Sequence, residues 1–240
     1  MRLGIMQPYF LPYLGYFQLL AAVDKMVLAD DVQFIKGGWI ASNTVLMGGE
    51  RHEFSIPLRR HPHTARIHEF RPADGFRAWR RRFLKTVTHG YHDARNFAEI
   101  FPMLGEWLSD PDAPISAINA RSIREICRWL RLPVEIVETS TGYANAHLRG
   151  TARLFDICRQ ERATTYVNSG GGRHLYRHAE FAQNGLTLRF VDPVLRPYPQ
   201  ASAEFIPSLS ILDLIMRASR AEARSHVLAG QLELPRESPV

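Results

Sequence analysis

Residues 6–16, which read MQPYFLPYLGY, hold the densest group of side chains in this chain that could bind a substrate. Gln7, Tyr9, Tyr13 and Tyr16 place neutral hydrogen-bonding groups around one short turn. A helix that begins just beyond the turn would offer free backbone N–H groups and a partial positive charge to a phosphate or carboxylate. We therefore take Gln7, Tyr9 and Tyr16 as candidate binding residues and Tyr13 as a candidate catalytic residue.

The prolines and the glycine of this segment suggest a nucleotide. Within residues 12–16, Tyr13 and Tyr16 have the spacing of the two histidines in the P-x-H-x-G-H signature of nucleotidylyl transferases, with Gly15 at the glycine position. Gly15 would let a nucleotide approach the backbone closely, and Pro8 would line the same turn. The alternative is that the aromatic rings pack a core while Pro8 and Pro12 only shape the turn.

A pair of acids follows the next apolar run, KMVLAD. Because they stand at the C-terminal end of a strand, we expect Asp30 and Asp31 to face the same crevice as the tyrosines of residues 6–16. They could hold Mg²⁺ beside phosphates or orient an amine, and both are candidate catalytic residues. The alternative is that one acid caps the backbone and the other is solvated. Lys36, a further catalytic candidate, then shares a glycine-containing loop with the binding candidates Trp39 and Asn43, and this loop could act as a lid.

A run of three glycines forms a third candidate segment. Asn168 and Ser169 precede it, Gly171 and Gly172 belong to it, and Arg173 follows at the expected start of a helix. Consecutive glycines can form a nest of N–H groups that binds an anion, although many such runs are simple turns. We expect the turn at 168–173 to complete the crevice formed by the first two segments. The Gly-Lys-Ser/Thr end of a Walker loop is absent from the sequence here.

The fourth candidate segment lies near the C-terminal end of the chain. Tyr198 and Gln200 precede Ser208 and Ser210, which stand at another expected helix start. We count Tyr198, Gln200 and Ser210 as candidate binding residues. For the serines, helix capping is the stronger interpretation.

Two further features carry less weight. His52, His61, His63 and His68 lack the ligand spacing of a helix or hairpin zinc site, so we predict no metal centre there. Residues 80–82 are three arginines whose simplest interpretation is a solvated helix face.

The elements that position these segments alternate between strand and helix. Residues 2–6, 13–24 and 25–30 form a strand, helix and strand, so they predict a βαβ unit and a parallel sheet. Residues 43–57 predict a hairpin around Gly48 and Gly49, and 58–72 a loop. Further helices are expected at 75–88, 93–108, 115–131, 150–162, 173–184 and 210–219, and further strands at 134–138, 165–168 and 186–191.

The resulting fold class is α/β, with a mostly parallel sheet, a Rossmann-like and nucleotidylyl-transferase-like N-terminal βαβ unit, and a helical insertion. We expect one domain over residues 1–240, with a division into 1–140 and 141–240 as the alternative.

The composition of the chain limits where it can act and which kinds of ligand it can bind. Of 240 residues, 45% are hydrophobic and 22% charged, which is typical of a globular protein. No run approaches about 20 apolar residues and no signal peptide opens the chain, so we expect a cytoplasmic protein without a membrane span. Cys127 and Cys158 are expected as reduced core thiols. A net charge of +6 favours a small anionic substrate such as a nucleotide or nucleotide sugar, whereas nucleic acid binding rests on charge alone.

Four blocks of this sequence resemble the WbqC-like protein family: MQPYFLPYLGYFQLL at 6–20, VDKMVLADDVQFIKGGWI at 23–40, NSGGGRHLY at 168–176 and FIPSLSILDLI at 205–215. The resemblance runs along nearly the whole chain. Family members are similar to proteins encoded with surface-polysaccharide genes, and one is proposed to attach glycine to a nucleotide-linked amino sugar in O-antigen synthesis. The resemblance implies a transferase or ligase that attaches an acyl or aminoacyl group to such an amine, with ATP and Mg²⁺ as candidate cofactors.

Two alternatives stay open beside this activity: a non-catalytic nucleotide-binding or ligand-binding protein of a polysaccharide pathway, and a nucleotidylyl-transferase-like enzyme. By analogy with pantothenate synthetase, Tyr13 and Tyr16 would contact phosphate, and Asp30 or Asp31 would position or deprotonate the amine. The chain departs from the family at Ser42 and Thr44, because arginines usually flank the asparagine between them.

Overall fold

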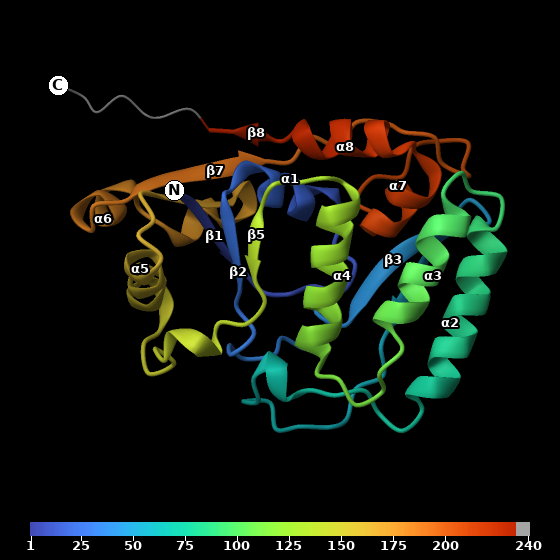
Figure 1. Ribbon diagram of the computed structural model, residues 1–240, viewed down its shortest axis with the longest axis horizontal. Helices are drawn as coiled ribbons and strands as arrows, with labels where there is room; N and C mark the ends of the chain where they lie inside the picture. Colours follow the sequence, from blue (N-terminus) through green and yellow to red (C-terminus); the bar gives the residue numbers. More distant parts are fainter. Residues whose placement is uncertain (234–240) are drawn as a thin grey trace.

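The computed structural model, which describes residues 1–233, is built around a six-stranded sheet with the strand order β5-β2-β1-β6-β7-β8 (Figure 1). All neighbouring strands are parallel except β8, which runs antiparallel to β7. This confirms the predicted α/β fold with a mostly parallel sheet. The strands are β1 (Arg2–Met6), β2 (Lys25–Leu28), β5 (Glu135–Val137), β6 (Thr165–Ser169), β7 (Thr187–Asp192) and β8 (Gln231–Leu232).

The strand order reverses direction beside β1. The chain builds β1, β2 and β5 outward to one side and then returns to place β6 and β7 on the other side of β1. This is the 3-2-1-4-5-6 order of doubly wound nucleotide-binding folds, apart from the antiparallel last strand. Sheets of this kind bind ligands at the carboxyl ends of the two strands that flank the reversal, which here are β1 and β6.

Side chains alternate between two hydrophobic cores, one on each face of the sheet. Met26 and Leu28 of β2 belong to one core, and Val27 belongs to the other. The first core contains residues of α1 (Leu14–Ala22), α4 (Ile115–Trp129), α7 (Ile211–Arg217) and α8 (Arg220–Leu228). The second contains residues of α5 (Gly150–Gln160) and α6 (His178–Gln183).

The expected helical insertion lies between β2 and β5. It begins with the predicted hairpin, formed by β3 (Ser42–Met47) and β4 (Glu50–Ser55), whose turn residues Gly48 and Gly49 both have positive φ. A loop with one short 3₁₀ turn, η1 (Ile67–Glu69), leads to α2 (Phe76–Tyr91), α3 (Phe97–Trp107) and α4. In Figure 1 these helices form the side of the molecule away from α5 and α6.

The structure corrects the expectations for the C-terminal part of the chain. The helix expected at 173–184 is instead a 3₁₀ segment, η3 (Gly170–Leu175), followed by the shorter α6. Helix α8 and strand β8 were not predicted. Ser210 does cap α7 through the backbone N–H of Leu212, but the full capping box of this region belongs to Ser219 and Glu222 at α8.

Both cysteines lie in the hydrophobic cores. Cys127 and Cys158 are buried and free, and burial raises the pKa of each thiol to about 12.

Among residues 1–233, no helix combines the length and apolar character needed to cross a bilayer.

Candidate functional site

The turn after β1 contains a backbone position that must be held in place. Leu11 has a φ of +47°, in the left-handed region that a branched residue rarely adopts. The Asn43 side chain donates to the carbonyls of Phe10 at 3.1 Å and Leu11 at 2.7 Å, and the Ser210 hydroxyl donates to the Leu11 carbonyl at 2.8 Å. Asn43 and Ser210, both predicted as binding residues, are buried supports of this turn.

A residue that the sequence did not point to holds the start of the same turn. Asn119 of α4 is fully buried, and its amide donates to the carbonyls of Pro8 at 3.0 Å and Ile40 at 2.8 Å. The backbone N–H of Phe10 donates to the carbonyl of Trp39 at 3.1 Å. The turn after β1 and the loop after β2 are therefore fixed to each other.

A cavity of about 570 Å³ opens at the carboxyl ends of β1 and β6, where the strand order reverses. A second cavity of about 390 Å³ adjoins it and shares three lining residues with it, namely Tyr9, Tyr13 and Trp39. We call the two together the switch-point groove. Its other lining residues include Gln7, Gly15, Tyr16, Ile35, Asn43, Asn168, Ser169, Gly171, Gly172, Leu175, Tyr176, Leu195 and Ser208.

Tyr13 occupies the place where a side chain on residue 15 would lie. A Cβ built on Gly15 would come within 2.5 Å of the Tyr13 ring, so Gly15 here accommodates Tyr13. Tyr13 also hydrogen bonds to the Ser169 side chain, which joins the turn after β1 to the glycine turn after β6. The structure thus brings together two segments that are more than 150 residues apart in the sequence, as expected for one groove.

The tyrosines of the groove are hydrogen-bond donors. Burial raises the pKa of Tyr9 and Tyr13, and raises that of Tyr16 well above its ordinary value. All three therefore stay protonated at neutral pH, and none of them is a base there. The Tyr16 hydroxyl donates its proton to the Gln7 carbonyl at 2.9 Å, so in this structure Tyr16 fixes the turn and has no proton left for a phosphate.

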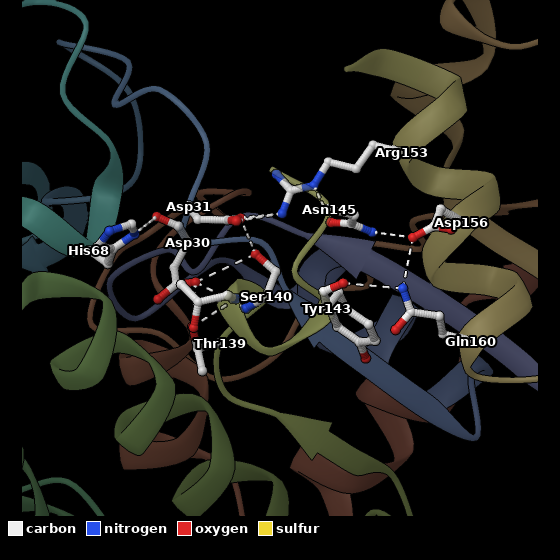
Figure 2. A network of polar contacts seen from close by, with 11 residues as sticks. Asp30, Asp31, His68, Thr139, Ser140, Tyr143, Asn145, Arg153, Asp156 and Gln160 are labelled. Atoms are coloured by element: carbon white, nitrogen blue, oxygen red, sulfur yellow. Dashed lines mark hydrogen bonds and ion pairs between the residues drawn. The ribbon is translucent and has the colours of Figure 1, made fainter. Parts of the chain in front are cut away.

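Asp31 is the first of the two acids that the structure places away from the groove. Its carboxylate oxygens both lie 2.6 Å from the Arg153 guanidinium of α5, and the Ser140 hydroxyl donates to one of them (Figure 2). Burial alone would raise the pKa of Asp31, but the bonds from Arg153 and Ser140 outweigh it and lower the pKa. Arg153 is held in turn by Asn145 at 2.9 Å.

Asp30 belongs to the same polar network. Its carboxylate accepts from the Thr139 hydroxyl at 2.8 Å and from the Ser140 backbone N–H at 3.0 Å, while its carbonyl accepts from the His68 backbone at 2.9 Å (Figure 2). Neither acid lines the groove. The expectation that Asp30 and Asp31 face the tyrosines is therefore corrected: they join the end of β2 to the segment after β5.

The glycine turn is positioned by its arginine. Arg173 was expected to add charge to an anion site, but its guanidinium pairs with Asp192 of β7 at 2.5 and 2.7 Å and lies over the Phe190 ring. Gly171 and Gly172 do line the groove, as expected, and so does Asn168. Arg173 is a support for the turn and does not line the groove.

The fourth segment contributes different residues from those predicted. The Tyr198 hydroxyl donates to the fully buried Asp213 at 2.8 Å, and Gln200 bonds to the backbone of Ile206. Neither Tyr198 nor Gln200 lines the groove. The residue of this segment that does is Ser208, which has a positive φ of +60°.

Exposed apolar side chains at the rim of the groove were missed. Ile35, Trp39 and Leu175 are 57%, 55% and 61% exposed, and all three line the 570 Å³ cavity. Only Trp39 was predicted. Single exposed apolar residues are common on protein surfaces, so no sequence signal distinguishes Ile35 or Leu175 before the loops are placed.

Asp30 and Asp31 are poorly arranged to bind a metal ion. Both oxygens of Asp31 already accept from Arg153, and an arginine beside a carboxylate competes with a cation for it. Among residues 1–233, no three His, Cys, Asp or Glu side chains gather into a metal site. The surroundings of Asp30 and Asp31 therefore do not fit a Mg²⁺ site.

Lys36 and the two positions that depart from the family lie outside the groove. Lys36 lines a neighbouring cavity, as does Ser42, whose hydroxyl donates to that of Ser55. Thr44 is buried, and its carbonyl accepts from the Ser210 backbone at 2.8 Å.

Comparison with known proteins gives one family and one relative. The model of the WbqC-like protein family matches residues 7–225. The chain is 28% identical over 231 residues to the uncharacterized protein Rv1507c of Mycobacterium tuberculosis, an alignment that covers 94% of this chain and 97% of that protein. No solved structure gives a significant match.

Proposed function

Since this chain belongs to the WbqC-like protein family, we propose that it binds a nucleotide-linked amino sugar in the switch-point groove. We further propose that it transfers an acyl or aminoacyl group, such as glycyl, to the amine of that sugar. The reaction would be a cytoplasmic step of surface-polysaccharide synthesis. The donor would be an activated acid, formed with ATP or supplied already activated.

The observation that carries the proposal is the position and lining of the groove. It lies where doubly wound sheets bind nucleotides, and its volume suits a small molecule. The half-exposed Trp39 offers a face on which a base can stack, and Tyr9 and Tyr13 offer hydroxyl donors. An uncharged base and sugar are well matched by such aromatic and neutral polar groups.

The chemistry asked of the groove is modest. The neutral amine attacks the acyl carbon, an amide bond forms, the bond to the carrier breaks, and the amine proton leaves to solvent. Tyr13, which its raised pKa keeps protonated, can donate to the oxyanion that forms on the acyl oxygen. The N–H group of Gly171, which the first turn of η3 leaves without a partner inside that helix, can serve the same purpose.

A second candidate is a non-catalytic binding protein of the same pathway. One observation favours it: within residues 1–233, no Asp, Glu, His, Lys or Arg side chain lines the groove. General acid–base catalysis needs a group with a pKa near the working pH, and the tyrosines do not provide one. This candidate predicts ligand binding without turnover.

A thermal-shift screen followed by a turnover assay tests both candidates. Nucleotide-linked amino sugars, the matching sugars without the amine, ATP and glycine are the ligands. A ligand at about 100 times its Kd stabilises the folded state by about 2.7 kcal/mol, a rise of several degrees in Tm. Trp39→Ala should weaken binding by about fivefold or more, because base stacking contributes about 1–3 kcal/mol.

The matched control is Leu228→Ala, which shortens another half-exposed apolar side chain that does not line the groove. Leu228→Ala should leave ligand affinity unchanged. Mass spectrometry of the sugar after incubation with glycine and ATP then separates enzyme from binding protein. No shift with any nucleotide sugar, or equal losses in Trp39→Ala and Leu228→Ala, would contradict the proposed function.

A further inference from the structure

A third cavity lies beside the switch-point groove, and the charged side chains that line it are all basic. It encloses about 1020 Å³ between the loop after β2 and the segment after β4. Lys36 comes from the first of these, and Arg59, Arg60, His61 and His63 come from the second. No Asp or Glu of the described chain lines this cavity, which we call the basic cavity.

Two of these cationic side chains do not stabilise the fold through any polar contact within residues 1–233. Lys36 and Arg60 are exposed, and neither makes an ion pair or hydrogen bond with residues 1–233. Arg59 makes one exposed pair with Asp112 at 3.6 Å, which is weak at such a position. A concave surface with charge of one sign concentrates the field inside it, so the basic cavity should attract anions.

Contacts that do not involve Lys36, Arg59 or Arg60 hold the walls of the basic cavity. Phe34 stacks on Phe70 with ring centroids 4.2 Å apart, and the His61 ring lies 4.7 Å from Phe70. The Gln33 side chain donates to the His63 carbonyl at 2.9 Å, which ties the two loops together. The cationic groups are therefore presented by a wall that is already fixed.

We infer that the basic cavity binds the phosphate groups of a phosphorylated small molecule. Arginine and lysine are the side chains that bind phosphate, and a concave site of this size fits a metabolite. Ile35 lines both the basic cavity and the groove, so the phosphates can belong to the groove ligand or to a second phosphorylated molecule. The inference stands on charge and shape and does not depend on acyl transfer.

Isothermal titration with inorganic pyrophosphate in low salt tests the site. We expect one pyrophosphate per chain, and at least about tenfold weaker binding in the double variant Lys36→Ala and Arg60→Ala, since each charge-assisted contact is strong. The matched control is Arg81→Ala with Arg82→Ala, which removes the same charge from exposed positions of α2. This control should bind pyrophosphate within about twofold of the wild type, and both variants should unfold near the wild-type Tm because the four side chains are exposed.

Several outcomes would overturn the inference: no pyrophosphate binding, equal weakening in both double variants, or single-stranded RNA binding that depends on Lys36 and Arg60 while pyrophosphate does not bind. The nucleotide sugar then identifies the source of the phosphates. If the affinity for the nucleotide sugar falls in the double variant Lys36→Ala and Arg60→Ala, the basic cavity binds the phosphates of that sugar. If this affinity is unchanged, the basic cavity binds a second phosphorylated molecule. Pyrophosphate binding without nucleotide-sugar binding would support this site and contradict the proposed function.

Discussion

The pair formed by Asp31 and Arg153 is the residue-scale feature with the clearest energetic consequence. Both side chains are buried, and Arg153 compensates the carboxylate for its lost hydration. Arg153→Met should therefore leave an unpaired buried charge and lower the free energy of unfolding by about 3–5 kcal/mol at pH 7. Urea unfolding of the variant and the wild type measures this.

The pH dependence of that loss has a defined sign. In the wild type the folded pKa of Asp31 is lowered, so the stability it contributes is present above the unfolded value of about 3.9 and is lost as pH falls through the folded pKa. In Arg153→Met, burial without a cation raises the pKa, so the deficit should shrink as the pH falls from 7 toward 5. The double variant Asp31→Asn with Arg153→Met should be more stable at pH 7 than Arg153→Met alone. Two results together would contradict an ion pair between Asp31 and Arg153: a loss of unfolding free energy in Arg153→Met that is the same at every pH, and a loss in the double variant that equals the sum of the two single losses.

At this scale the sequence predicted the groove better than it predicted the acids. The tyrosine turn and the glycine turn both follow strands of the predicted parallel sheet, so both were expected at its carboxyl edge. The role of Asp31 depends on Arg153, which lies 122 residues away and inside a helix with no unusual motif. An adjacent pair of acids after a strand has the same appearance whether it holds a metal or an arginine.

At the scale of elements, the turn after β1 depends on its neighbours for its shape. Asn43 of β3 is its closest support, because one amide satisfies two carbonyls next to the strained Leu11. Asn43→Ala should cost about 1–3 kcal/mol of unfolding free energy, since both carbonyls would lose a buried partner. It should also weaken ligand binding in the groove.

Ser42→Ala is the matched control on the same strand, because Ser42 is only half-buried and bonds to one exposed hydroxyl. Its change in stability should stay within about 0.5 kcal/mol. Equal unfolding curves for Asn43→Ala and the wild type would show that the turn holds its shape without this amide.

The parallel strands and the amphipathic helices were the predictable elements, and the last helix, α8, was not. Helix α4 presents a clear apolar face, and it was placed within two residues of its observed ends. Helix α8 buries only Ala223 and Val227, so its sequence carries little periodic signal. Its position is set by tertiary contacts, including the buried Gln18 of α1, whose amide donates to the carbonyls of Val194 and His226.

At the scale of the whole molecule, the two halves of the chain share one sheet and one main core. The strands of residues 1–140 form β5-β2-β1, and those after residue 140 form β6-β7-β8. The main core contains Leu28 and Ile123 from the first half and Val167, Ile211 and Val227 from the second. The switch-point groove needs both halves, because β1 supplies one wall and β6 the other.

This arrangement predicts that a fragment of residues 1–140 cannot fold alone. Without β6 the hydrogen-bonding edge of β1 would be open, and without α8 the apolar side chains of α1 would be exposed to water. The fragment should therefore show no cooperative thermal transition by circular dichroism, whereas the full chain should unfold in one transition with equal calorimetric and van't Hoff enthalpies. Two resolved transitions in the full chain, or a cooperative transition in the fragment, would instead support two domains that divide near residue 140. In that case the groove would lie between domains, and its ligand would be expected to change their relative orientation.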